Sequence, residues 1–304
     1  MTRLNGKVVL ITGGGGGIGA AVAERLAADG ARIIVHDLGV SLDGKSTGDP
    51  GPAQRVADGI VTAGGEAVAE FGDVTDYDAM GAVFERAIQR WGSVDVIVPV
   101  AGILRDRMIF NMTPEEWDAV IRVHLRGLFT VSSHAARHWR SQEPTVGQRR
   151  LIAVTSRSGL FGAATQPNYS AAKLGGVGFV YSSAKALSKY GVAAMAIAPT
   201  AATRMTATQP GDRATATAED AEFSPDNVAR VVSYLASDRS TWLNGQVVGS
   251  NGYQVDLYTR PRVGASVRRD APWDADDLAQ AVESEFAELT AAQSALGTPA
   301  KSDD

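Results

Sequence analysis

The feature that most constrains the fold of this chain is a glycine-rich stretch between a strand and a helix. Gly13, Gly17 and Gly19 follow residues 7–11, an aliphatic run typical of a buried parallel strand, and precede residues 20–26, which have the pattern of a helix. Glycines in this G-x-x-x-G-x-G spacing let the backbone turn tightly and approach a pyrophosphate at the N-terminus of the helix. A flexible linker is the alternative interpretation, and the flanking strand and helix argue against it.

Strands and helices alternate along most of the chain. We expect strands near residues 7–12, 31–37, 66–72, 94–98, 150–155, 192–198 and 246–250. We expect helices near residues 18–29, 52–64, 76–91, 114–140, 168–190 and 225–237. This alternation predicts an α/β fold: one doubly wound, Rossmann-type domain with a seven-stranded parallel sheet and helices on both faces. We assign residues 1–255 to this domain and residues 256–304 to a C-terminal extension.

An acidic residue at the end of the second expected strand points to the kind of dinucleotide. Asp37 lies 37 − 17 = 20 residues after Gly17, where a carboxylate suits the adenosine ribose hydroxyls and repels a 2′-phosphate. No Arg or Lys occurs between Thr12 and Ala23 to offset that repulsion. The sequence therefore predicts NAD rather than NADP. The alternative is an aspartate that caps a turn at the end of a strand.

A tyrosine and a lysine four residues apart form the candidate catalytic pair. Tyr169 and Lys173 become neighbours on one face of a helix, and the ammonium is expected to lower the pKa of the phenol. Ser156 ends the strand expected near residues 150–155, where the sheet presents its ligand-binding edge, and can hold a substrate oxygen beside Tyr169. Ser158 is a competing candidate. The alternatives are a solvated helix face for the pair and a turn-capping role for the serine.

These motifs together resemble the short-chain dehydrogenase/reductase family over about residues 5–255. The resemblance implies an enzyme that interconverts a secondary alcohol and a ketone by hydride transfer, with Ser156, Tyr169 and Lys173 as catalytic residues. It also implies an NAD site made by Gly13, Gly17, Ile18, Gly19, Asp37, Asp73, Val74, Ala101, Gly102, Tyr169, Lys173, Pro199 and Thr203.

The chain departs from the family pattern at three places. Pro99 and Val100 replace the usual Asn-Asn before Ala-Gly, and Thr200 replaces the glycine that usually follows Pro199. His124 takes the place of the family's catalytic asparagine, which normally shapes the helix and holds a water in a proton relay. A histidine titrates near neutral pH, and a lone histidine in a helix is more often structural, so we assign His124 a supporting role.

Within the family, three stretches resemble the D-3-hydroxyacyl-CoA dehydrogenase domain of the peroxisomal multifunctional enzymes of type 2 and related bacterial dehydrogenases. They are residues 36–39 with the long loop after them, residues 123–127 and residues 198–206. A (3R)-hydroxyacyl-CoA dehydrogenase is therefore the first hypothesis, and a dehydrogenase of hydroxysteroids or other lipophilic alcohols is the second. The third hypothesis, a non-catalytic NAD-binding sensor, is opposed by the intact catalytic set.

Composition narrows the remaining classes. The 304-residue chain has a net charge of −5 and no basic block, so we expect no nucleic-acid partner. It has no cysteine, and its four histidines are dispersed, so we expect no metal site. No apolar run reaches the roughly 20 residues of a membrane span. The first strand follows the N-terminus too closely for a signal peptide, so we expect a cytoplasmic location.

Three further segments are expected to have roles. The loop over residues 38–52 is expected to cover the adenosine end or border a subunit contact, and residues 200–224 to form a substrate lid or else a plain surface loop. The extension carries a basic cluster, with arginines suited to CoA phosphates or simply solvated, and a helix expected over residues 274–292. We expect it to wrap a neighbouring subunit or close the substrate cleft, in a homodimer or homotetramer.

Overall fold

The structure, a computed structural model, describes residues 4–143, 148–203 and 221–296. The chain divides into two compact units, Met1–Tyr258 and Thr259–Asp304. Most of the expected lid, residues 204–220, lies outside the described residues, as do Arg204, Met205 and Thr206 of the 198–206 stretch.

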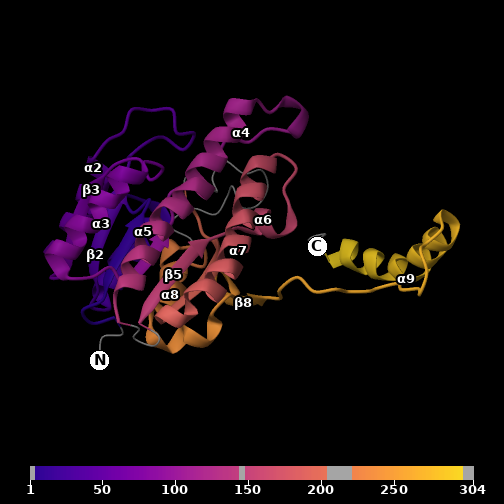
Figure 1. The fold of residues 1–304 in the computed structure, drawn as a ribbon. Helices are drawn as coiled ribbons and strands as arrows, with labels where there is room; N and C mark the ends of the chain where they lie inside the picture. The colour runs from indigo at the N-terminus through magenta and orange to yellow at the C-terminus, as the bar shows by residue number, and fades with distance from the viewer. Residues whose placement is uncertain (1–3, 144–147, 204–220, 297–304) are drawn as a thin grey trace. The chain divides into compact units, whose positions relative to one another are not determined.

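The first unit is built on an eight-stranded sheet with the strand order β3-β2-β1-β4-β5-β6-β7-β8 (Figure 1). The strands are Val8–Thr12 (β1), Arg32–Asp37 (β2), Glu66–Phe71 (β3), Val96–Pro99 (β4), Arg149–Val154 (β5), Val192–Thr200 (β6), Val247–Asn251 (β7) and Gln254–Tyr258 (β8). The first seven are parallel, so the predicted doubly wound fold is confirmed.

The eighth strand corrects the expectation of seven. The chain turns back through Gly252, whose φ of +57° suits glycine, and β8 pairs antiparallel with β7. Val255 and Leu257 are exposed on this edge strand. The segment is short and open to solvent, so it lacks the long apolar run that marks the inner strands. The expected domain boundary at residue 255 consequently falls within β8.

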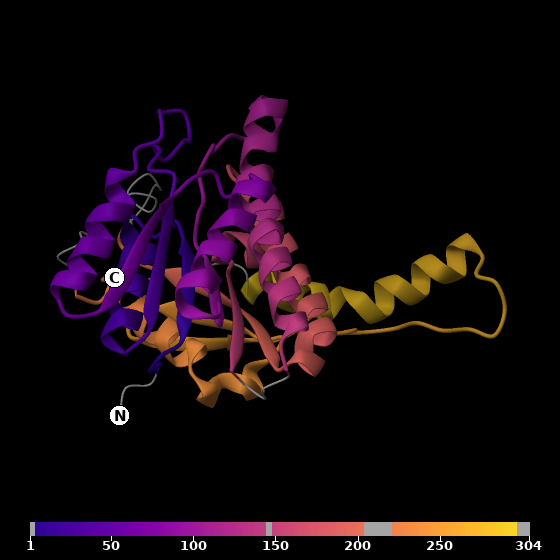
Figure 2. The ribbon, with the colours of Figure 1, turned by 60° about the vertical axis from the view of Figure 1, so that its left-hand side comes forward.

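Helices cover both faces of the sheet, as Figures 1 and 2 show. On one face, α1 (Gly17–Ala28), α2 (Gly51–Thr62) and α8 (Pro225–Ala236) pack around a core that includes Val22, Leu26 and Val232. On the other face, α3 (Tyr77–Trp91), α5 (Gly127–Ser141) and α7 (Pro167–Leu187) bury Phe84, Trp139 and Val180. The other helical segments among the described residues of this unit are η1 (Ile109–Asn111), α4 (Pro114–Ile121), η2 (Arg122–Arg126), α6 (Arg157–Phe161), η3 (Ser188–Tyr190) and η6 (Asp238–Leu243).

The helix expected over residues 114–140 is divided into three pieces. It begins as α4 with a capping box, in which the Thr113 hydroxyl accepts from the amide of Glu116 and the Glu116 carboxylate accepts from the amide of Thr113. It then widens into the π-helical turn η2 and continues as α5. Single π turns inside α-helices are frequent at functional sites, and this one carries His124.

The second unit contains helix α9 (Ala275–Leu296), close to the helix expected over residues 274–292. Before it, Arg269 lies over the ring of Trp273 and forms ion pairs with Asp274 and Asp277 at 3.4 and 2.8 Å. No helix in the described ranges has both the length and the apolar character needed to cross a membrane.

Candidate active site

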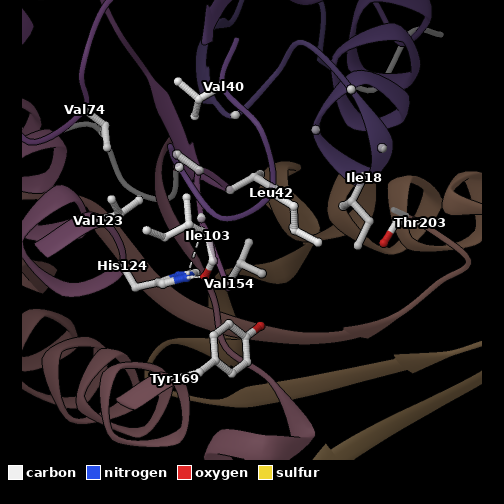
Figure 3. A pocket seen from close by; sticks show the side chains of 18 of the residues that line it. Ile18, Val40, Leu42, Val74, Ile103, Val123, His124, Val154, Tyr169 and Thr203 are labelled. Carbon is white, nitrogen blue, oxygen red and sulfur yellow. Dashed lines mark hydrogen bonds between the residues drawn. The ribbon is translucent and has the colours of Figure 1, made fainter. Parts of the chain in front are cut away.

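A cavity of about 370 Å³ lies at the carboxyl ends of the parallel strands (Figure 3). It is the edge at which open α/β sheets bind their ligands. Every residue that the sequence assigned to catalysis or to cofactor binding lines this cavity, and so does the competing Ser158. The sequence therefore located the cavity correctly, while the roles of the individual residues remain predictions.

One end of the cavity is formed by backbone. At Gly13, where φ is +71°, a β-carbon would lie 2.6 Å from the amide nitrogen of Ala101. A β-carbon on Gly19 would overlap the carbonyl oxygen of Gly13. Helix α1 begins just after Gly16, which provides no side-chain cap, so the amides of its first turn are left for a ligand. A narrow glycine loop at an uncapped helix N-terminus fits a dinucleotide pyrophosphate.

Asp37 joins two loops beside this end. One carboxylate oxygen accepts from the amide of Gly15 at 2.8 Å, and the other accepts from the amide of Gly39 at 2.6 Å. The carboxylate thereby fixes the glycine loop to the segment that follows β2. Thr203 lies against the same loop, with side-chain carbons 3.6 and 3.8 Å from the β-carbon position of Gly17.

The segment after β2 lines the cavity along residues 38–44, which the sequence marked only as a loop with a covering or contact role. It is attached to the chain beyond β4: the amide of Leu104 donates to the carbonyl of Leu42, and Nε of Arg105 donates to the carbonyl of Asp43, both at 3.0 Å. Other lining residues that the sequence missed include Ile103, Ala119 and Arg157, because no motif marks them.

The opposite end carries the candidate catalytic pair on α7. Nζ of Lys173 donates to the carbonyl of Val154 at 2.8 Å, and the Thr155 hydroxyl donates to the carbonyl of Lys173 at 2.9 Å. The end of β5 is thus fixed to the helix that carries the pair. Nζ lies 5.5 Å from the centre of the Tyr169 ring. The hydroxyl of Tyr169 points into the cavity (Figure 3).

Ser156 has two contacts that bear on its alternative interpretations. Its Oγ accepts from the amide of Ser158 at 3.1 Å and so caps the short helix α6, which is the structural role that the sequence left open. The side chain of Ser156 also acts on the phenol, because as a hydrogen-bonding neighbour it lowers the pKa of Tyr169. Between the two serines, Ser156 therefore has the contact with the phenol.

Burial dominates the electrostatics of the pair. It raises the pKa of Tyr169 to about 12, opposed by the hydrogen bond from Ser156 and reinforced by the charge of Asp106. It lowers the pKa of Lys173 to about 7. The sequence predicted that the ammonium would make the phenol more acidic, but in the structure the cost of burying either charge outweighs that attraction.

His124 lies on the π turn, with its ring edge-on to that of Tyr169 and the ring centres 5.0 Å apart. Its Nε2 donates to the carbonyl of Ile103 at 2.8 Å. Gly102 makes room for the ring, since a β-carbon there would overlap Cε1 of His124. Burial and the charge of Lys173 hold the pKa of His124 well below its usual range. The expectation of titration near neutral pH is therefore wrong.

A second cavity, of about 10 Å³, lies among residues that include Thr12, His124 and Lys173. Thr12 Oγ1 and His124 Nδ1 are both buried without a hydrogen-bond partner among the described residues. Such a space is about the size that a single water occupies, and it is lined by polar atoms that a water would satisfy. This arrangement is consistent with the supporting role predicted for His124.

Comparison with known proteins agrees with this geometry. Residues 7–214 match the short chain dehydrogenase family. The hydroxyacyl-CoA dehydrogenase ChsB1 of Mycobacterium tuberculosis is 38% identical over 94% of this chain and 90% of its own length. The mouse peroxisomal multifunctional enzyme type 2 is 37% identical over 88% of this chain, which spans 35% of that longer protein. A crystal structure of a short chain dehydrogenase from Mycobacterium avium is 40% identical, with a TM-score of 0.82 and coverage of 94% and 96% of the two chains.

The chain belongs to the short-chain dehydrogenase/reductase family and is an enzyme that acts on CH–OH groups. The resemblance drawn from the sequence is thereby confirmed.

Proposed function

We propose that the protein is an NAD-dependent (3R)-hydroxyacyl-CoA dehydrogenase. The observation that carries the proposal is one cavity with an uncapped glycine loop at one end and Ser156, Tyr169 and Lys173 at the other. The names of the hydroxyacyl-CoA dehydrogenase and multifunctional-enzyme relatives support acyl-CoA as the substrate class.

The roles of the side chains follow from their positions. Tyr169 takes the proton of the substrate hydroxyl during oxidation and returns it to the carbonyl oxygen during reduction. Ser156 holds the substrate oxygen while its charge changes. Lys173 orients the nicotinamide ribose, and His124 keeps a relay water in place. When bound, NAD supplies the acceptor or donor of the hydride.

The choice of NAD over NADP rests on Asp37. Its carboxylate lies beside the glycine loop. A 2′-phosphate on the adenosine ribose of the bound dinucleotide would meet like charge there. Asp73 also lines the cavity, and it is paired there with Arg122, another lining residue, at 3.3 Å. Asp37 is therefore the carboxylate that favours the dinucleotide without the extra phosphate.

Near Tyr169, where the substrate would bind, the cavity has apolar walls that include Leu42, Ile103 and Val123 (Figure 3). They suit an acyl chain. They suit a steroid ring equally well, which supports a hydroxysteroid or other lipophilic alcohol dehydrogenase as the second candidate.

The decisive experiment measures NADH formation by the purified protein with (3R)- and (3S)-hydroxyacyl-CoA and with steroid alcohols, using NAD and NADP in parallel. We expect turnover with the (3R) thioester and NAD. Preference for the (3S) isomer or for steroid alcohols would replace the substrate assignment, and tighter binding of NADP would overturn the cofactor assignment. The absence of turnover with every alcohol, together with tight NAD binding, would favour the non-catalytic sensor.

We also propose a homodimer or homotetramer in which the extension, residues 259–304, contacts a neighbouring subunit or covers the substrate. Phe129 on α5 and Leu174 on α7 are exposed apolar side chains that suit a subunit contact. Removing residues 259–304 should change the mass measured by light scattering or the affinity for acyl-CoA. An unchanged mass and affinity would remove both roles.

A further inference from the structure

The chain beyond β4 places a carboxylate next to the helix that carries the candidate catalytic tyrosine. Oδ2 of Asp106 accepts a hydrogen bond from Nε2 of Gln166 at 2.8 Å. The other oxygen, Oδ1, is buried and has no hydrogen-bond partner among the described residues. Burial of an unsatisfied carboxylate oxygen is costly, and it raises the pKa of Asp106, while the hydrogen bond from Gln166 opposes that rise.

Backbone contacts fix this carboxylate at the N-terminal end of α7. The amide of Arg107 donates to the carbonyl of Thr165 at 2.7 Å. On the other side of Asp106, Nδ2 of Asn168 donates to the carbonyl of Arg105 at 3.1 Å. Gln166 is itself buried and lies one turn before Tyr169. The position of Asp106 is therefore set by the same helical turn that sets the position of the phenol.

The groups around the phenol come from four elements. Lys173 lies one turn later on α7, His124 packs against the ring from the π turn, and Ser156 approaches from the end of β5. The other charged side chains near Asp106 have partners other than the phenol. Arg105 donates to the carbonyls of Asp43 and Glu115, and Glu116 of α4 is paired with Arg107 at 3.4 Å.

We propose that Asp106 is a positioning residue for the reaction: held by Gln166 at the N-terminal end of α7, its carboxylate shifts the pH range in which Tyr169 acts. A negative charge beside a phenol disfavours the phenolate, because like charges repel in a buried site. Asp106 thus keeps Tyr169 protonated, and so able to protonate a carbonyl oxygen, up to a higher pH, and it delays the action of Tyr169 as a base. This inference rests on the proposed catalytic role of Tyr169.

The test compares the pH dependence of alcohol oxidation in the wild type and in Asp106→Asn, which removes the charge and keeps the size. We expect the rise of kcat with pH to move to lower pH. If the midpoint falls by a whole pH unit, the phenolate fraction at any pH below it grows by about ten-fold. Asp106→Glu should return the profile towards that of the wild type. Asp118→Asn, an exposed acid on α4, is the matched control and should leave the profile unchanged.

A merely structural role predicts a different result. Asp106→Asn would then lower the rate at every pH without moving the profile, and that outcome would overturn the inference. If Asp106→Asn does not fold, as judged by its thermal melt, Asp106→Ser provides a second uncharged variant.

A second measurement needs no substrate. Isotope-labelled tyrosine is titrated by NMR, and the Tyr169 signal is identified by its absence in Tyr169→Phe. We expect a lower midpoint in Asp106→Asn than in the wild type. An unchanged midpoint would overturn the inference even if the enzyme is active. Conversely, a lower midpoint in a protein that oxidises no alcohol would uphold the effect of Asp106 on the phenol while the proposed function, and with it the role in the reaction, fails.

Discussion

The two ends of the cavity are formed by different parts of the chain, backbone at one end and side chains at the other. The glycine-loop end is made of backbone, and its fit depends on space: a single β-carbon at Gly19 would overlap a carbonyl oxygen. The catalytic end is made of buried side chains, and burial moves the pKa of Tyr169 up and that of Lys173 down. The first end is therefore sensitive to volume and the second to charge. Substitutions that change only one of these properties should separate the two ends.

The largest expected effect is at the catalytic end. Tyr169→Phe removes the proton donor and almost no volume, so turnover should fall by about 10²- to 10⁴-fold. NAD affinity, measured by calorimetry, should stay close to that of the wild type. Tyr253→Phe, at an exposed turn, is the control and should retain full activity. A Tyr169→Phe variant that still turns over would contradict the assignment of this end as catalytic.

The charge of Lys173 should appear in the stability of the protein. Its pKa is about 7 in the folded chain against 10.5 ordinarily, so within this window the unfolded chain binds more protons and stability rises with pH. One proton changes the free energy of unfolding by at most about 1.4 kcal/mol per pH unit. Denaturant titrations across the window should show this rise in the wild type and a flatter profile in Lys173→Met. Lys185 is exposed on the same helix, so Lys185→Met should keep the rise. Equal slopes in all three proteins would show that burial does not lower the pKa of Lys173.

At the glycine-loop end, volume alone should be damaging. Gly19→Ala should destabilise the protein by about 1–3 kcal/mol and weaken NAD binding, since the loop has to move away from the added methyl group. Gly59 lies in α2 with open space at its β-carbon position. Gly59→Ala should therefore stabilise the protein by roughly 0.5–1 kcal/mol through helix propensity. Similar effects of the two substitutions on NAD affinity would show that the glycine loop has room for a side chain.

The smallest expected effect is the interaction free energy between substitutions at Gly102, where volume matters, and at His124, a buried side chain beside Tyr169. Gly102→Ala should be destabilising because its methyl group would overlap the imidazole. In a His124→Asn background that penalty should shrink, giving an interaction free energy of about 0.5–3 kcal/mol in a double-mutant cycle. Additive effects would mean that the ring moves away without cost.

The sequence predicted the glycine-loop end better than the catalytic end. Glycine spacing and the acid at residue 37 report backbone geometry directly, and these residues do line one end of the cavity. The motif residues at the other end also line the cavity, but the directions of their pKa shifts were not predicted from the sequence. The sequence does not reveal that burial would outweigh the attraction between Tyr169 and Lys173, because burial depends on what packs over the pair.

Two structural features escaped prediction for local reasons. The π turn at His124 leaves the hydrophobic pattern of residues 114–140 helical, so nothing in that pattern distinguishes one wider turn. Strand β8 is short and exposes Val255 and Leu257, which makes it resemble a loop in sequence. Asp106 carries no motif at all, and its relation to Tyr169 depends on contacts made by Gln166.

The two hydrogen bonds of Asp37 have a consequence for redesign of the coenzyme preference. If the proposed preference for NAD holds, replacing this aspartate with alanine would remove the repulsion of a 2′-phosphate, but it would also take away the acceptor of the Gly15 and Gly39 amides. The two loops would then be released together at the place where the new phosphate has to be held. A variant engineered for the phosphorylated dinucleotide therefore needs both an added cation and a substitute acceptor that keeps these loops tied.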